Sequence, residues 1–295
     1  MVGLAADVVE RTVEQAVHPP PQLLRPYVDN AVGFHLRGFP PGEHIGLPSR
    51  HLTLIVTFDA PLVLRVLPDG TERTETFDAM LGGLHTSPAL IAHDGNQHGI
   101  HVHVTPAGAW TLFGVPAGEL AEVVVDLEAV WGRLAVELSD RLATQRSWTG
   151  RFAVLDEVLQ RALAARVELP SGAKRETMEA WRLLTASGGA VPISAVADEV
   201  GWSRRHLSER FAGDFGVGPK QLARVLRFER ARDMIVRPRR PSLATVAATC
   251  GYADQAHMAR DWRSLAGLSP TAWLAAEELS FVQVEPAMDE TSWFA

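Results

Sequence analysis

The sequence contains a single cysteine, Cys250, among its 295 residues. One cysteine cannot form a disulfide within the chain. It also excludes a zinc site built from cysteines, and no cysteine is left for an alkyl-transfer reaction in the first part of the chain. The scarcity of cysteine fits a reducing compartment, so we expect a cytoplasmic protein. Cys250 itself is predicted to be a small buried apolar residue.

Long apolar runs are also absent. No stretch approaches the ~18 apolar residues that a membrane-spanning helix needs. The N-terminal region carries Asp7, Glu10 and Glu14 instead of a basic start followed by an unbroken apolar segment. We therefore expect neither secretion nor membrane insertion. The sequence has no Gly-x-Ser-x-Gly and no phosphate-loop motif, so it carries no signature of those enzyme classes, and no cofactor is expected.

Basic residues are outnumbered overall, with 28 Lys and Arg against 35 Asp and Glu and a net charge of −7. Their distribution along the chain is uneven. Residues 1–170 hold 12 basic against 20 acidic residues, residues 171–276 hold 16 against 10, and residues 277–295 hold none against five. A local basic block attracts phosphate and makes binding depend on salt. A solvated arginine-rich face gives the same pattern, so charge alone leaves DNA binding open.

Apolar patterns divide the chain, whose hydrophobic content of 46% is enough for two domains. After a start that we expect to be mobile, residues 30–110 are β-rich. Strands are expected at His51–Phe58, Leu62–Leu67 and Gly99–Thr105. Pro68-Asp69-Gly70 predicts a hairpin turn after the second of these strands. The pattern indicates a small β-sandwich or β-barrel.

Helical spacing follows from Glu119 to about Arg166. Apolar residues recur three and four positions apart, at Leu134, Leu138 and Leu142 and at Phe152, Leu155, Leu159 and Leu163. Such helices could pack on the β unit or pair two subunits. The segment 168–173 has the composition of a linker. We therefore expect an α+β protein with a β-rich domain at 1–170, an all-α domain at 175–278 and an acidic tail at 279–295.

The sequence beyond residue 190 contains one helical unit twice. Five residues of the first copy, Ile193, Val196, Ala197, Val200 and Gly201, recur 50 positions later as Leu243, Val246, Ala247, Cys250 and Gly251. After the turn the offset becomes 51, and Ser203, Leu207, Phe211, Gly216 and Pro219 correspond to Asp254, Met258, Trp262, Gly267 and Pro270. Agreement at so many positions indicates a true repeat.

Each copy predicts a helix, a tight turn and a second helix. Gly201 and Gly251 suit the left-handed conformation that ends a helix, and Ser203 and Asp254 suit the N-cap of the next one. The matched apolar pairs form a stripe that docks the second helix on the first, and the matched prolines suit the first turn of a further helix. This is the helix-turn-helix motif.

A continuous helix is expected between the copies, from Pro219 to Val236. Its apolar residues Leu222, Val225 and Leu226 are predicted to point inward, and its arginines, Arg224, Arg227, Arg230 and Arg232, mostly outward. Such a helix would fix the separation of the two recognition helices. Recognition helices held about 34 Å apart enter successive major grooves, so one subunit could contact two adjacent groove segments.

Residues 175–278 resemble the DNA-binding domain of the AraC/XylS family of bacterial transcriptional regulators. The resemblance rests on Gly-Trp-Ser-Arg-Arg-His-Leu-Ser-Glu-Arg-Phe at 201–211, on Cys-Gly-Tyr-Ala-Asp-Gln-Ala-His-Met-Ala-Arg-Asp-Trp at 250–262 and on Gly-Leu-Ser-Pro at 267–270. The family usually has phenylalanine or leucine in place of Met258 and phenylalanine in place of Trp262, and both replacements stay apolar. The resemblance implies a double helix-turn-helix domain that binds double-stranded promoter DNA.

The N-terminal part is similar, more loosely, to the β-barrel sensing or dimerisation domains of such regulators, around residues 98–106 and 112–116. This resemblance implies that residues 1–170 sense a small molecule, pair subunits, or both. It further implies a transcriptional regulator and not an enzyme, with a lean toward activation. RNA polymerase and a second copy of the chain are its candidate partners. The effector, the operator and the oligomeric state are left open.

Side chains opposite the apolar stripe, on the first turns of each recognition helix, are expected to contact DNA. In the first copy these are Arg204, Arg205, Ser208 and Glu209, and in the second Gln255, Ala256, Ala259 and Arg260. Arginine pairs with guanine, glutamine with adenine, and alanine contacts the thymine methyl group. Glu209 has an alternative role, an ion pair with Arg205. The second helix offers fewer polar groups, so it should discriminate less between sequences.

Three histidines support an alternative, in which a cupin-like metal-binding or small-molecule-binding enzyme domain is fused to the DNA-binding domain. His98, His101 and His103 lie close in sequence, and His-x-His on a strand places both imidazoles on one face, as in half of a metal site. The glutamate expected a few residues later is missing. We therefore favour polar histidines on the solvent or lumen face of a strand, with no metal site and no catalytic residue.

Overall fold

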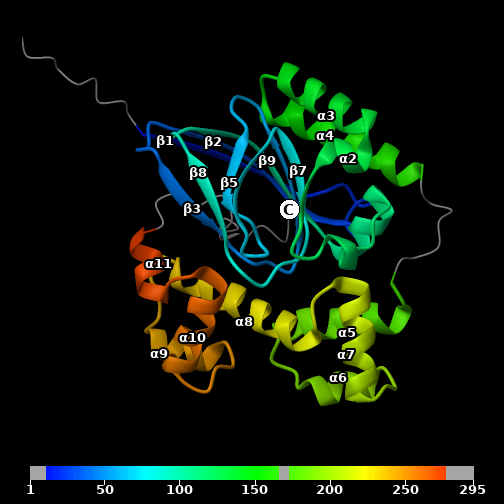
Figure 1. Ribbon diagram of the computed structural model, residues 1–295, viewed down its shortest axis with the longest axis vertical. Coiled ribbons are helices and arrows are strands. Elements are labelled where there is room, and N and C mark those ends of the chain that lie inside the picture. The colour runs from blue at the N-terminus through cyan, green and yellow to red at the C-terminus, as the bar shows by residue number, and fades with distance from the viewer. Residues whose placement is uncertain (1–10, 166–172, 277–295) are drawn as a thin grey trace, which may run out of the picture.

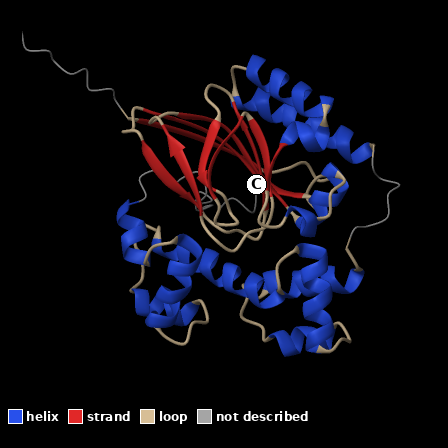
Figure 2. Cartoon of the chain, viewed as in Figure 1, coloured by secondary structure: helices blue, strands red, loops and turns tan. Residues whose placement is uncertain are grey.

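Figure 1 shows the computed structural model of the chain, which describes residues 11–165 and 173–276. The strands lie in the first part of the chain, with helices beside them, and the second part is entirely helical (Figure 2). All strand pairs within the described residues are antiparallel. The α+β class expected from the sequence is confirmed.

The strands form two sheets. The larger has the order β1 (Thr12–His18), β2 (Val28–Arg37), β9 (Gln97–Val104), β4 (Leu52–Thr57), β7 (Ala79–Gly82) and β10 (Val124–Asp126). The smaller has the order β3 (Gly42–Gly46), β8 (Ala89–His93), β5 (Leu62–Val66) and β6 (Glu72–Phe77). Because the two sheets remain separate, this domain is an open sandwich and not a closed barrel.

Short helices connect the sheets to two longer ones. They are α1 (Pro106–Gly108), the π-helix η1 (Ala109–Phe113), the 3₁₀-helix η2 (Ala117–Leu120), α2 (Leu127–Trp131), α3 (Arg133–Thr144) and α4 (Trp148–Ala164). The leucines expected at helical spacing, Leu138, Leu142, Leu155, Leu159 and Leu163, are buried in α3 and α4. These two helices pack on the larger sheet, in one core with Ile100, Val102 and Val104 of β9.

The sequence located the central strands better than the outer ones. Strands β4, β5 and β9 lie where they were expected, and Gly70, with φ of +83°, makes the predicted hairpin between β5 and β6. The expectation of a mobile start before residue 30 was wrong for Thr12–His18, which forms β1 at the edge of the larger sheet. Among the strands that the structure describes, β1 pairs only with β2. Buried and exposed side chains do not alternate regularly along it, so its sequence resembles a loop.

The second part contains seven helices within residues 173–276. They are α5 (Arg175–Ala186), α6 (Ile193–Glu199), α7 (Arg204–Phe215), α8 (Pro219–Ile235), α9 (Leu243–Thr249), α10 (Gln255–Ala266) and α11 (Pro270–Ala276). Helix α8 is the continuous helix expected between the two repeats, and Leu222, Val225 and Leu226 point inward as expected. Helices α8 and α11 begin at the two matched prolines.

The two parts of the chain are in contact. In η2, a Cβ added to Gly118 would lie 2.6 Å from the carbonyl oxygen of Gly213, which shows how closely η2 approaches α7. On the other side, Leu47 is buried in the core of α8, α9 and α10. Of the expected linker at 168–173, the structure describes residue 173 alone, and the expected tail at 279–295 lies outside the described residues. Among the helices that the structure describes, none is long and apolar enough to cross a membrane.

Candidate nucleic-acid interface and interdomain pocket

Helices α6 and α7 form the first helix-turn-helix unit. Gly201 follows the end of α6 with φ of +72°, the left-handed conformation that lets the chain reverse. The Ser203 hydroxyl accepts a hydrogen bond from the amide of His206 at the start of α7. Leu207 and Phe211 have no exposed surface and hold α7 against its neighbours. The apolar spacing therefore determines which face of α7 is buried, and the opposite face is exposed.

Helices α9 and α10 repeat this geometry. Gly251 has φ of +78°, Asp254 accepts a hydrogen bond from the amide of His257 at 2.6 Å, and Met258 and Trp262 are fully buried. Residues 191–199 and 241–249 have the same sequence of buried, half-buried and exposed positions. The predicted repeat is thus present in three dimensions, and Cys250 is buried as expected.

The predicted DNA-contacting residues are nearly all accessible. Those of α7, namely Arg204, Arg205, Ser208 and Glu209, are exposed, as are Gln255, Ala256 and Arg260 of α10, whereas Ala259 is half-buried. The Arg205 Nε donates to Glu209 Oε1 at 2.8 Å. The ion pair raised as an alternative role for Glu209 therefore exists, and it leaves the rest of the Arg205 guanidinium directed outward.

The prediction that the arginines of α8 point mostly outward was wrong. Only Arg230 of the four is exposed, whereas the side chain of Arg232 is 8% exposed. Arg224 and Arg227 turn toward Asp261 of α10, with Arg224 Nε 3.1 Å from Asp261 Oδ1. Helical spacing assigned these arginines to solvent because it takes no account of α10 packing beside α8. Asp261 was missed, since its match in the first copy is the exposed Arg210.

The smaller and larger sheets enclose a pocket that also touches α8. Its apolar lining includes Ile55, Leu62, Leu64, Met80 and Ile91, and its polar lining includes Arg50, His51, His101, His103, Glu229, Arg232 and Asp233. Its volume is about 110 Å³. Because the last three polar residues belong to α8, the pocket lies where the first domain meets the helix that joins the two helix-turn-helix units.

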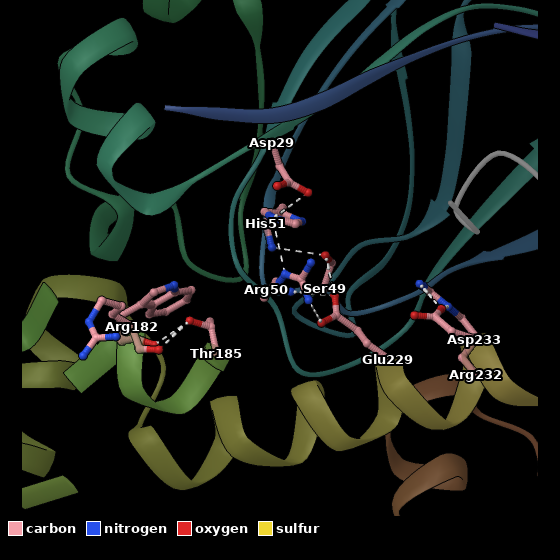
Figure 3. A network of polar contacts seen from close by, with 10 residues as sticks. Asp29, Ser49, Arg50, His51, Arg182, Thr185, Glu229, Arg232 and Asp233 are labelled. Atoms are coloured by element: carbon pink, nitrogen blue, oxygen red, sulfur yellow. Dashed lines mark hydrogen bonds and ion pairs between the residues drawn. The ribbon is translucent and has the colours of Figure 1, made fainter. Parts of the chain in front are cut away.

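Hydrogen bonds and an ion pair connect the first domain to α8 beside this pocket (Figure 3). Glu229 Oε1 accepts hydrogen bonds from the Ser49 hydroxyl at 2.9 Å and from the amide of Arg50 at 3.0 Å. Arg50 Nη1 lies 3.7 Å from Glu229 Oε2. Glu229 is only 6% exposed, so this carboxylate is held by the loop before β4. None of these contacts could be inferred from the sequence, because about 180 residues separate the partners.

The histidines of the first domain separate into two groups. His101 and His103 share one face of β9 and line the pocket together with His51. Burial is the main cause that lowers the pKa of His51 and His103 well below the usual value, and neighbouring histidines and arginines lower it further. His98 lies on the other face of β9, because side chains alternate along a strand. The three histidines of the enzyme alternative therefore do not form one site.

His98 instead meets His35 and Asp59, with potential ligand atoms within 4.8 Å of one another. The rings of His35 and His98 are stacked, with centroids 3.8 Å apart and planes 7° apart. A metal ion lies in the plane of each imidazole that binds it, so two rings stacked in this way cannot share one ion. Arg37 and Arg151 also donate to Nε2 of His35 and His98, respectively. The geometry fits a hydrogen-bonded cluster and not a metal centre.

Comparisons with known proteins found one family model and several solved structures that are similar to parts of this chain. A family model described as a helix-turn-helix domain matches residues 196–276. ToxT from Vibrio cholerae O395 is 11% identical, with a TM-score of 0.48, over 89% of this chain and 97% of ToxT. The C-terminal domain of AraT from Geobacillus stearothermophilus is 16% identical, with a TM-score of 0.34, over 41% of this chain and 96% of that domain.

A DNA-binding transcriptional dual regulator from Escherichia coli K-12 is 21% identical, with a TM-score of 0.31, over 35% of this chain and 99% of that one. A search of curated proteins found no match. The family match covers both recognition helices, the helix between them and both turns, which are the features already seen in the geometry. Residues 196–276 are therefore a helix-turn-helix domain of the AraC type, and the chain that carries this domain is a DNA-binding transcriptional regulator.

Proposed function

We propose that the chain is a cytoplasmic, ligand-responsive activator that binds a bipartite promoter site with both recognition helices. Bases are contacted by Arg204, Arg205, Ser208 and Glu209 of α7 and by Gln255, Ala256, Ala259 and Arg260 of α10. The observation that carries this proposal is the presence of two capped helices with exposed polar faces, joined by α8. Helices joined in this way suit successive segments of one major groove.

In this proposal, Glu209 contributes mainly by orienting the Arg205 side chain through their ion pair. The hydrogen bond at 2.8 Å uses Arg205 Nε, which leaves both terminal nitrogens of the guanidinium for a guanine. Two such nitrogens match the O6 and N7 acceptors of that base. Because a carboxylate beside DNA phosphates is unfavourable unless it is paired, the ion pair also explains how Glu209 is tolerated on this face.

The signal is proposed to be a small organic anion bound in the interdomain pocket. The apolar lining fits a short hydrocarbon group, and Arg50 and Arg232 are the cations that would bind a carboxylate. A cavity of about 150 Å³ holds benzene, so about 110 Å³ suits a molecule of at most that size, or a somewhat larger one if a lining side chain moves. A second cavity, about 500 Å³, includes no residue of the DNA-binding domain in its lining.

A carboxylate bound in this pocket would compete with Glu229 of α8 for the Arg50 guanidinium. Arg50 is 3.7 Å from Glu229 and Arg232 donates to Asp233 at 2.9 Å. A ligand anion that draws Arg50 away from Glu229 weakens the contact between the first domain and α8. Since α8 carries both helix-turn-helix units, the occupancy of the pocket would alter how they are held on DNA.

The proposal is tested by selecting DNA from a random duplex library with the full chain, followed by sequencing of the bound fraction. Enrichment of two half-sites about one helical turn apart is expected. Binding without sequence enrichment would refute base contacts by the two helices. Repeating the selection with a panel of small aromatic and aliphatic carboxylates, and with their amides as neutral controls, tests the effector class.

The partners follow from the same proposal. An activator acts on RNA polymerase at the promoter, so transcription from the selected site should rise when the chain is added to a purified polymerase. A homodimer would bind two bipartite sites, whereas a monomer would bind one. Light scattering of the free chain, and of its complex with one selected site, distinguishes the two states. A fall in transcription would identify a repressor and contradict the activator assignment.

A further inference from the structure

The loop between α8 and α9 carries three arginines in four residues. We call residues 237–240, with Arg237, Arg239 and Arg240, the arginine loop. All three side chains are exposed. Within residues 11–165 and 173–276, none of them forms a hydrogen bond or an ion pair through its guanidinium. Three neighbouring like charges repel one another, so the loop places cations where the described fold does not neutralise them.

The internal repeat shows that the fold does not need this charge. Fifty positions earlier, the loop between α5 and α6 has Ser187, Gly188, Gly189 and Ala190 at the equivalent places. Both loops lead into helices with the same burial pattern, α6 and α9. An uncharged loop therefore makes the same connection, and the arginines of the second copy serve something other than the turn.

The arginine loop lies beside the expected path of a DNA strand. In a helix-turn-helix domain, the recognition helix lies in the major groove and the preceding helix crosses the backbone. In the second copy these helices are α10 and α9, which pack together at the end of α8 (Figure 1). Pro241 and Ser242 alone separate residues 237–240 from α9, so the cations of the arginine loop are close to the strand that α9 crosses.

We propose that the arginine loop binds phosphates of the DNA backbone. The second helix-turn-helix unit then adds affinity mainly through charge, whereas the first supplies most of the base contacts. This division fits α10, which exposes fewer polar groups at its start than α7. The phosphate contact requires only that the chain binds DNA, and only the division of roles depends on the base contacts proposed above.

The test compares two triple variants of the full chain on the selected site and on random DNA. The first, Arg237→Gln, Arg239→Gln and Arg240→Gln, neutralises the arginine loop. The control, Arg25→Gln, Arg133→Gln and Arg146→Gln, removes three exposed arginines from the first domain and gives the same net charge. Affinity is measured between about 50 and 200 mM salt, the range over which phosphate contacts strongly affect binding. Thermal unfolding checks that both variants fold.

Removing one phosphate interaction should reduce the slope of log affinity against log salt by about 0.9. For three such interactions, the ratio of wild-type to variant affinity then changes about 40-fold across this fourfold range of salt. The weakening should be the same on the selected and the random DNA, and the enriched sequence should not change. An unchanged slope, or an equal change in the control, would overturn the proposal, as would a changed enriched sequence. If the wild-type chain does not bind DNA, the proposed function fails first.

Discussion

Arg227 of α8 donates a hydrogen bond from Nη1 to the carbonyl oxygen of Gly189, 3.1 Å away in the loop before α6. Its Nη2 lies 3.9 Å from Asp261 of α10, and its guanidinium carbon lies 5.6 Å from the ring centre of Tyr252. One side chain thus joins the loop before α6 to the second helix-turn-helix unit. Because the side chain is 17% exposed, these contacts are partly shielded from water and salt.

Replacing Arg227 by alanine should loosen the spacing of the two recognition helices. Asp261 would keep only Arg224, and the free energy of unfolding should fall by about 1–3 kcal/mol. Selection from a library in which the half-site separation varies should give one preferred separation for the wild-type chain and a broader distribution for the variant. The exposed neighbour Arg230, also changed to alanine, is the matched control and should keep a single separation. A sharp preference in the Arg227 variant would show that α8 packing alone fixes the spacing.

Changing Arg205 to alanine should remove discrimination at one position of one half-site. The expected loss is about 1–3 kcal/mol against the preferred base, the usual value of a bidentate contact with guanine. Arg210, which is exposed on the same helix but farther from its start, serves as the control. Binding to the selected site and to random DNA is compared by titration. If both weaken equally, Arg205 contacts phosphate and the base assignment is wrong.

The helix-turn-helix units could be predicted from sequence because their determinants are local. A glycine at positive φ, a capping side chain and an apolar pair four residues apart act within about 12 residues, and the repeat presents each of them twice. The exposed face of α7 followed from the same spacing. By contrast, the partners of β1 are distant in sequence, in β2 and in α4, and its own residues Thr12–His18 carry little strand signal.

Tertiary contacts account for what the sequence did not predict. Arg232 was expected in solvent, but the loop before β4 and the first-domain pocket cover that face of α8. His98 was grouped with His101 and His103 by proximity in sequence, whereas the alternation of a strand puts it on the opposite face. The interdomain contact of Glu229 with Ser49 joins segments about 180 residues apart, which no local pattern encodes.

Changing Glu229 to glutamine should strengthen the binding of a small carboxylate in the interdomain pocket. The amide oxygen can still accept from Ser49 and from the Arg50 amide, but it no longer competes for the Arg50 guanidinium. We expect about a tenfold gain in affinity, equivalent to about 1.4 kcal/mol. Calorimetry with a carboxylate and with its neutral amide distinguishes the effect of the ligand's charge on affinity from the effect of its shape, since the amide should show no gain. Equal gains for both ligands would contradict competition for Arg50.

His44 of β3 should make stability depend on pH. Burial, and then the neighbouring His93, lower the pKa of His44 from 6.5 to about 4. The unfolded chain therefore binds a proton in this interval that the folded chain does not, so the free energy of unfolding falls as pH drops from 6.5 toward 4, by up to about 1.4 kcal/mol per unit. Urea unfolding at several pH values should show a smaller dependence of the free energy of unfolding on pH for His44→Asn than for wild type. A His44→Asn slope equal to that of wild type would assign the acid sensitivity to other groups, beginning with His51 and His103, whose buried imidazoles also resist protonation.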